Sequence, residues 1–191
     1  MSETRTRAII LVPLVVFTVV VAFFGLGYLV TMIFQIPLKL NFPLSIRLIG
    51  LLILGLGLLF FGWLFRYRSP VDILVSTYLT FSKVGRRVRL EDRSRRTEPL
   101  VVKGPYGYVR HPLYSGVVLL VLGWWLLLDY SFLLASAIFL LLWFNFVVTP
   151  FEEEELRAIF GDDYERYAKQ VPKIIPFTKR HKKLLQMARL R

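Results

Sequence analysis

The sequence contains no cysteine, which excludes disulfide bridges, thiolate metal sites and catalysis by a thiol nucleophile. Acidic residues are also scarce, because 13 Asp and Glu stand against 25 Lys and Arg, giving a net charge of +12. Charge of either sign is missing from several long stretches, and hydrophobic residues make up 55% of the chain, with a mean hydropathy of +0.56. This composition is too apolar for an ordinary soluble domain and indicates an integral membrane protein.

The excess of basic residues does not indicate nucleic-acid binding, because these residues lie between and after apolar runs rather than along one soluble face. Anionic membrane lipids are the expected partner. The first apolar run, which follows Arg5 and Arg7, is longer than the core of a signal peptide and has no small-x-small cleavage pattern near its end. We therefore expect it to be a retained membrane span.

Four apolar runs are candidates for membrane spans. They cover residues 8–34, 44–65, 113–128 and 132–148, and only three residues separate the last two runs. About 20 apolar residues cross a bilayer core, so the first two runs are long enough and the last two are slightly short. We predict an all-α polytopic membrane protein with about four transmembrane helices in two hairpins, plus cytoplasmic interfacial helices.

The second run contains four glycines, which would allow another helix to approach closely. They are Gly50, Gly55, Gly57 and Gly62. Because glycine is common in membrane helices in any case, the pattern leaves close packing at these positions open.

The apolar runs and the polar segment between them divide the chain into an N-terminal transmembrane hairpin (residues 1–68), a basic cytoplasmic connector (69–103) and a catalytic module (104–191). The connector begins with apolar residues at helical spacing, which predicts a packed amphipathic helix at the membrane surface rather than a re-entrant element. These residues are Val71, Leu74, Val75, Tyr78 and Leu79.

The distribution of Lys and Arg predicts the orientation. Residues 66–110 contain eleven basic residues and the chain after Pro150 contains ten, whereas the opposite turns hold only Lys39 and Arg47. Since basic residues concentrate on the cytoplasmic side, both termini and the middle segment are expected to be cytoplasmic. The basic tail at 179–191 is either a surface helix or a solvated end.

Two polar clusters flank the last hairpin. One lies within residues 104–116 and the other is the glutamate run 152–155. A tight hairpin returns the chain to its starting face, so the two clusters should be neighbours. Paired carboxylates can bind an ammonium group or ribose hydroxyls, and Arg or His can bind a carboxylate, so a zwitterion bearing a sugar, such as S-adenosyl-L-methionine, would fit. Each cluster also has an ordinary structural explanation, in headgroup contacts and in the helix dipole.

The motifs in these clusters are recognisable. The first reads G-x-Y-x-x-x-R-H-P-x-Y, and the second reads E-E-x-x-L-x-x-x-F-G-x-x-Y-x-x-Y, followed by V-P-x-x-I-P. Over residues 100–176 the chain resembles the isoprenylcysteine carboxyl methyltransferase and phospholipid methyltransferase superfamily of membrane enzymes. The resemblance implies methyl transfer from S-adenosyl-L-methionine to a hydrophobic or lipid-like acceptor at a cytoplasmic site, with no metal.

The resemblance also assigns residues to a cofactor pocket. The expected cofactor-binding residues are Leu100, Val101, Tyr106, Arg110, His111, Pro112, Leu113, Tyr114, Glu152 and Glu153. The catalytic residues stay unknown, with Arg110 and His111 as candidates, and Arg110 is expected to orient the loop or to bind the cofactor carboxylate. Glu154 and Glu155 are expected to be solvated. A packed cap is expected from Tyr164, Tyr167, Val171, Pro172 and Pro176.

One departure bears on the acceptor. Isoprenylcysteine-directed members carry an arginine four residues before the glutamate pair, and this chain has Val148 there. An amine, a hydroxyl or a different lipid acceptor is therefore favoured over a prenylcysteine carboxylate. Two alternatives stay open, an NADPH-dependent sterol reductase and a non-catalytic membrane adaptor. The reductases share R-H-P-x-Y, but many of them have an asparagine and an acidic residue where this chain has Leu113 and Val117.

Overall fold

The computed structural model describes residues 2–86 and 100–176. The elements of this part are α1 (Ser2–Ile33), α2 (Leu44–Phe65), α3 (Pro70–Arg86), the 3-10 helix η2 (Gly104–Gly107), α4 (Pro112–Leu128), α5 (Ser131–Trp143), the π-helical turn η3 (Phe144–Val148), α6 (Thr149–Phe160) and α7 (Asp162–Gln170). Within residues 2–86 and 100–176 no strand is formed, and the β-type pairing there is an isolated bridge between Lys39 and Tyr130. The predicted all-α class is confirmed.

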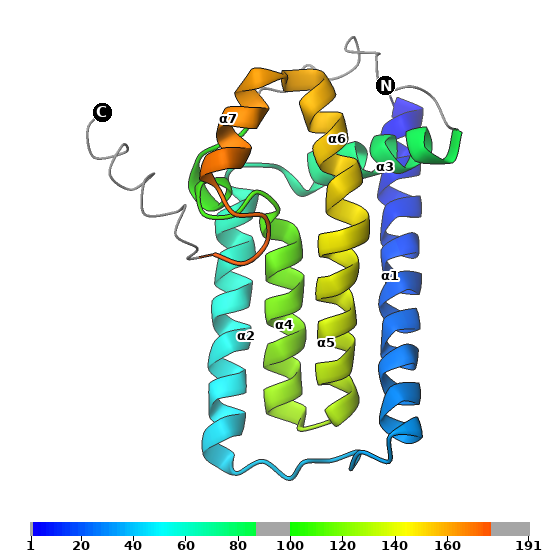
Figure 1. The fold of residues 1–191 in the computed structure, drawn as a ribbon, viewed down its shortest axis with the longest axis vertical. Helices are drawn as coiled ribbons and strands as arrows, with labels where there is room; N and C mark the ends of the chain where they lie inside the picture. Colours follow the sequence, from blue (N-terminus) through cyan, green and yellow to red (C-terminus); the bar gives the residue numbers. More distant parts are fainter. Residues whose placement is uncertain (1, 87–99, 177–191) are drawn as a thin grey trace, which may run out of the picture.

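The long helices form a row in the order α2, α4, α5, α1, with neighbouring helices running in opposite directions (Figure 1). Helix α5 continues through η3 into α6, so the three elements make one long helix. Helix α3 lies across one end of the row, against α1 and α6, as expected for the surface helix (Figure 1). The start of α1 lies at this same end, together with α6 and α7.

The predicted packing of the first hairpin, in which α1 and α2 would be partners, is wrong. The main contacts of α1 are with α5 and those of α2 are with α4, so the α4–α5 hairpin lies between the two (Figure 1). Small residues explain this arrangement, because a Cβ added to Gly27 of α1 would lie 2.4 Å from Ser136 Oγ of α5. A Cβ on Gly57 of α2 would similarly lie 2.6 Å from a methyl carbon of Leu120 in α4. The second hairpin, with its tight turn, is confirmed.

Within the part of the chain that the structure describes, three helices are long and apolar enough to cross a membrane: Arg5–Ile33, Leu44–Phe65 and Ser131–Phe160. Helix α4 is apolar but shorter, at 17 residues. Large hydrophobic side chains cover the outer surfaces of α1 and α2; Phe17 is 67% exposed and Leu59 72% exposed. Such a surface would be costly in water and fits contact with lipid, as expected of an integral membrane protein.

An ion pair connects the two turns at the other end of the row. Asp129 is fully buried and adopts a left-handed backbone conformation with φ of 57°. Its carboxylate accepts a hydrogen bond from Arg47 of α2, and its carbonyl accepts one from the Leu40 N–H at 3.0 Å. These contacts hold the α1–α2 loop against the α4–α5 turn.

The α2–α4 contact predicts opposite effects of alanine at two glycines of α2. A Cβ on Gly50 would lie 2.6 Å from Leu127 N, whereas a Cβ on Gly55 meets nothing within 4 Å. We expect Gly50→Ala to destabilise the fold by about 1–3 kcal/mol through overpacking. Gly55→Ala should be neutral or stabilising by up to about 1 kcal/mol. Thermal unfolding in detergent, followed by circular dichroism, measures both, and equal effects would contradict the close contact.

Candidate active site

The two polar clusters meet at the end of the row where α6 begins. His111 lies between two carboxylates, with Nδ1 3.1 Å from Glu152 Oε2 and Nε2 3.2 Å from Glu153 Oε1. The Tyr114 hydroxyl donates to Glu152 Oε1 at 2.5 Å. The predicted proximity of the two segments is therefore confirmed.

Glu153 is buried and surrounded by cations. Arg110 Nη2 lies 2.8 Å from its Oε1, and Arg157 Nη2 lies 3.3 Å from its Oε2. Arg110 also donates from Nη1 to the Ala168 carbonyl at 2.8 Å. A buried carboxylate is tolerated only where cations and hydrogen bonds compensate its charge, and the contacts of Glu153 with Arg110, Arg157 and His111 supply that compensation.

The charge state of His111 follows from this environment. Burial lowers the pKa of His111, but the hydrogen bonds and charges of Glu152 and Glu153 outweigh burial and raise it above the ordinary value of 6.5. Because the folded-state pKa is raised, the protonated ring stabilises the fold fully below pH 6.5, and this contribution is lost as the pH rises through the folded-state value. His111 therefore favours the cationic form, which donates from both ring nitrogens.

The chain after α7 fixes the loop that carries Arg110 and His111. The Arg110 N–H donates to the Pro172 carbonyl at 2.9 Å, and the His111 N–H donates to the Lys173 carbonyl at 3.0 Å. Ser115 Oγ donates to the Ile174 carbonyl at 2.6 Å. The backbone of residues 172–174 thus holds the loop that carries Arg110 and His111.

Helix α7 forms a packed cap over the same loop. Tyr164, Tyr167, Ala168 and Val171 make a buried cluster against Leu100, Leu156 and Phe160. The Tyr167 hydroxyl donates to the Tyr106 carbonyl at 2.7 Å. The expected cap is confirmed for Tyr164, Tyr167 and Val171.

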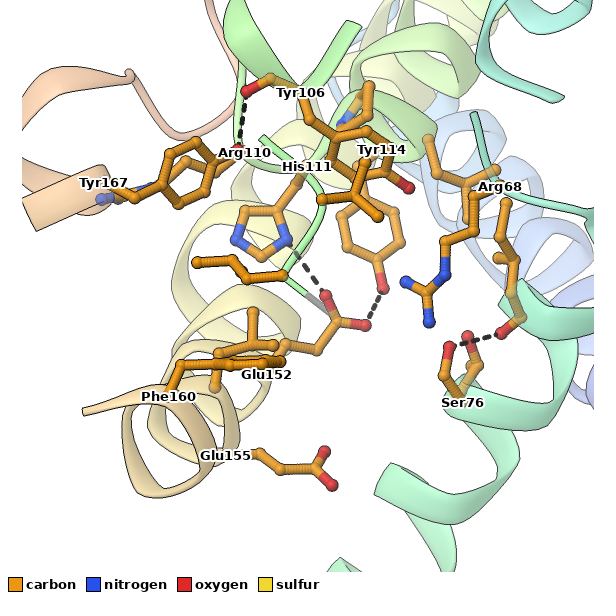
Figure 2. Close-up of a pocket in the computed structure, with 17 residues that line it drawn as sticks. Arg68, Ser76, Tyr106, Arg110, His111, Tyr114, Glu152, Glu155, Phe160 and Tyr167 are labelled. Atoms are coloured by element: carbon orange, nitrogen blue, oxygen red, sulfur yellow. Dashed lines mark hydrogen bonds and ion pairs between the residues drawn. The ribbon is translucent and has the colours of Figure 1, made fainter. Parts of the chain in front are cut away.

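A pocket opens beside Glu152, between α3, the loop, α4, α6 and α7 (Figure 2). Nine of the ten residues expected at a cofactor site line it: Leu100, Val101, Tyr106, Arg110, His111, Pro112, Leu113, Tyr114 and Glu152. The tenth, Glu153, lies behind His111 in the ion-pair cluster. Leu100 and Val101 precede η2 as irregular chain rather than as a strand.

Glu155 corrects an expectation, because its side chain is 1% exposed and lines the pocket instead of being solvated. Residues three apart share one face of a helix, so Glu155 lies on the same face of α6 as Glu152, toward α3. Glu154 lies between them in sequence and is exposed, as expected.

Arg68 is a pocket residue that the sequence analysis did not identify. It lies in the turn between α2 and α3, and its guanidinium points into the pocket between Tyr114 and Ser76 (Figure 2). Its place just after an apolar run is also where basic residues commonly contact headgroups. The sequence feature that could have identified Arg68 is its position directly before the surface helix α3.

A second, apolar cleft adjoins the pocket and holds about 350 Å³. Ile73, Thr77, Leu113 and Tyr114 line both spaces. The remaining lining residues are Val12, Pro13, Val15, Val16, Val19, Val20, Phe65, Pro70, Leu74, Val117, Leu140, Trp143, Phe144 and Val148. Among the described residues that line the cleft, none is charged.

A phospholipid methyltransferase family model matches residues 53–163, more than half of the chain. Over 114 residues the chain is 38% identical to the methanethiol S-methyltransferase of Crocosphaera subtropica, covering 56% of this chain and 43% of that protein. It is 44% identical over 79 residues to the protein-S-isoprenylcysteine O-methyltransferase of Schizosaccharomyces pombe, covering 40% and 33% of the two chains. A probable protein-S-isoprenylcysteine O-methyltransferase of Oryza sativa is 37% identical over 92 residues, with 48% and 46% covered.

The chain thus matches less than half of the length of each of these relatives. No solved structure matches it significantly. The family match begins within α2 and ends in α7, so it spans both the loop with Arg110 and His111 and the glutamates of α6. With this match enclosing the segments that build the pocket, the chain belongs to the phospholipid methyltransferase family.

Proposed function

We propose that the protein is an integral membrane methyltransferase that transfers a methyl group from S-adenosyl-L-methionine to a hydrophobic acceptor. The observation that carries the proposal is the position of Glu152. Its carboxylate is held by His111 and Tyr114 in a polar pocket, and that pocket adjoins an apolar cleft through Tyr114. A polar donor and an apolar acceptor would meet there, in a chain of a methyltransferase family.

The residues of the pocket fit this donor. Each oxygen of Glu152 accepts one hydrogen bond within the protein, and a carboxylate oxygen has a further lone pair for an ammonium or a ribose hydroxyl. Tyr106, Tyr167 and Phe160 supply aromatic surface for an adenine ring. When bound, the donor supplies a methyl group activated by the sulfonium.

The protein's own contribution is positioning and the exclusion of water. His111 has both ring nitrogens against carboxylates and favours the cationic form, so it is suited to orienting Glu152 and Glu153 rather than to accepting a proton. The described walls of the cleft beside Tyr114 are apolar apart from Thr77 and the Tyr114 hydroxyl, which disfavours water there.

The cleft supports an uncharged acceptor. Val148 is buried and lines it, so the position of the arginine in isoprenylcysteine-directed enzymes is apolar here. A carboxylate in this cleft would lose hydration without gaining a cationic partner. A neutral amine, hydroxyl or thiol group on an apolar body fits the walls, and one relative is named for the small thiol methanethiol.

The proposed topology has four spans, with the termini and the pocket on the cytoplasmic side. Helix α4 has 17 residues and lies between α2 and α5, so it would cross with them despite its length. The start of α1 lies at the pocket end of the row, where basic residues concentrate in the sequence (Figure 1).

Donor binding tests the function directly. We expect calorimetry in detergent to detect S-adenosyl-L-methionine and not NADPH. Glu152→Gln should lose a charge-assisted hydrogen bond of about 1.5–3 kcal/mol, which lowers affinity by about 10- to 100-fold. The exposed neighbour provides the matched control, because Glu154→Gln removes the same charge without touching the pocket. Binding of NADPH alone would support a reductase, and binding of neither would support an adaptor.

The apolar cleft predicts a preference between two acceptors with the same prenyl chain. The wild-type protein should methylate a prenyl thiol at least about tenfold faster than a prenylcysteine, because an unpaired carboxylate would be buried at a cost of several kcal/mol. Val148→Arg should reduce this preference, and Val148→Leu should keep it. Efficient methylation of the prenylcysteine carboxylate by the wild-type protein would refute the neutral-acceptor proposal.

The topology predicts one-sided labelling of both ends. Because the chain has no cysteine, single cysteines at Ser2 and Gln186 provide unique labels. Both should react with a membrane-impermeant maleimide only after the cytoplasmic face is made accessible. Labelling of either from outside intact cells would contradict the four-span topology with cytoplasmic ends, and labelling of only one end would rule out an even number of spans.

A further inference from the structure

We infer that Arg68, rather than Arg110, binds the carboxylate of the donor's amino-acid group. This inference rests on the proposed function and concerns the same pocket. It starts from the guanidinium groups of Arg68 and Arg110, which line the described part of the pocket from opposite walls.

The guanidinium of Arg110 is part of the protein's buried framework. It lies 2.8 Å from Glu153 through Nη2 and donates at 2.8 Å to the Ala168 carbonyl through Nη1, and its side chain is 11% exposed. Turning it toward a ligand would remove a cation from the buried carboxylate of Glu153, which is costly. Arg110 is therefore a positioning residue for the loop and for α6.

Arg68 reaches the pocket from the opposite wall. Its N–H donates to the Leu64 carbonyl at 3.2 Å, which continues the last turn of α2 and fixes the backbone that carries the side chain. The guanidinium extends between Tyr114 and Ser76, on the side facing Glu152 (Figure 2). An arginine fork matches the two oxygens of a carboxylate, which gives this position geometric as well as charge complementarity.

The charges across the pocket suit an amino-acid zwitterion. Carboxylates from α6, Glu152 and Glu155, form one wall, and Arg68 belongs to the other. An ammonium group would face the glutamates while the carboxylate of the same group faced Arg68. Neutral aromatic surface at Tyr106 and Tyr167 is left for the nucleoside.

This assignment also places the reactive end of the donor beside the acceptor cleft. Phe65 and Pro70, on either side of Arg68 in sequence, both line that cleft. Ile73 and Tyr114 line both spaces. Since the sulfonium is only a few bonds from the amino-acid carboxylate, binding the carboxylate at Arg68 keeps the methyl group on the side of the pocket where an apolar acceptor arrives.

Two ligands that differ in the amino-acid group test the inference. S-adenosylhomocysteine carries the carboxylate, and 5′-methylthioadenosine has the same nucleoside thioether without it. By calorimetry on the whole chain in detergent, Arg68→Gln should weaken S-adenosylhomocysteine binding by about 10- to 100-fold, as expected for loss of a charge-assisted pair. Binding of 5′-methylthioadenosine should change by less than about twofold, which also shows that the pocket is folded.

Arg66→Gln is the matched control, because Arg66 is exposed two residues away and lines neither space; it should leave both affinities unchanged. Arg68→Lys, which keeps the charge but not the fork, should give an intermediate loss. An equal loss for both ligands, or no loss for either, would overturn the role of Arg68 while leaving the proposed function in place. Failure of the wild-type protein to bind any of these adenosine ligands would overturn both.

Discussion

The structure depends on the compensation of one buried charge, the carboxylate of Glu153. Its cationic partners Arg110 and His111 stand directly before α4, whereas Glu153 itself lies in α6, after the whole α4–α5 hairpin. The ion pairs therefore close the open end of the hairpin. Removing one partner would leave the buried charge only partly compensated, at a cost of up to about 3–5 kcal/mol. The loop, the start of α6 and the cap of α7 are held in place through this cluster.

The same cluster separates the buried carboxylate of Glu153 from the carboxylate of Glu152, which lines the pocket. Successive residues of a helix point about 100° apart, so burial of Glu153 turns Glu152 toward the pocket. His111 contacts both glutamates, so the buried position of Glu153 also fixes the ring that orients the Glu152 carboxylate. The two arginines divide similarly, with Arg110 in the buried cluster and Arg68 on the far wall of the pocket.

The hairpin and the meeting of the two polar clusters were predictable, because a tight turn between two apolar runs leaves the chain few alternatives. The separation of α1 from α2 could not be predicted. A Cβ on Gly50 or Gly57 would meet α4, whereas a Cβ on Gly55 or Gly62 would meet nothing within 4 Å, and the four glycines look alike in the sequence. Glu155 was misjudged because a run of four glutamates does not reveal which helix face is covered by α3. Arg68 was missed because no motif connects it to the pocket.

The boundary between the polar pocket and the apolar cleft lies at Tyr114. Its ring stacks on Phe144 with centroids 4.5 Å apart and 18° between planes, while its hydroxyl donates to Glu152. Phe144 begins the π-helical turn, which ends at Val148, so the irregular turn supplies both the ring under Tyr114 and an apolar wall of the cleft. A π turn also adds one residue to the helix, which sets the rotation at which α6 presents Glu152. The helical irregularity between α5 and α6 thus couples the shape of the apolar cleft to the direction of the carboxylate.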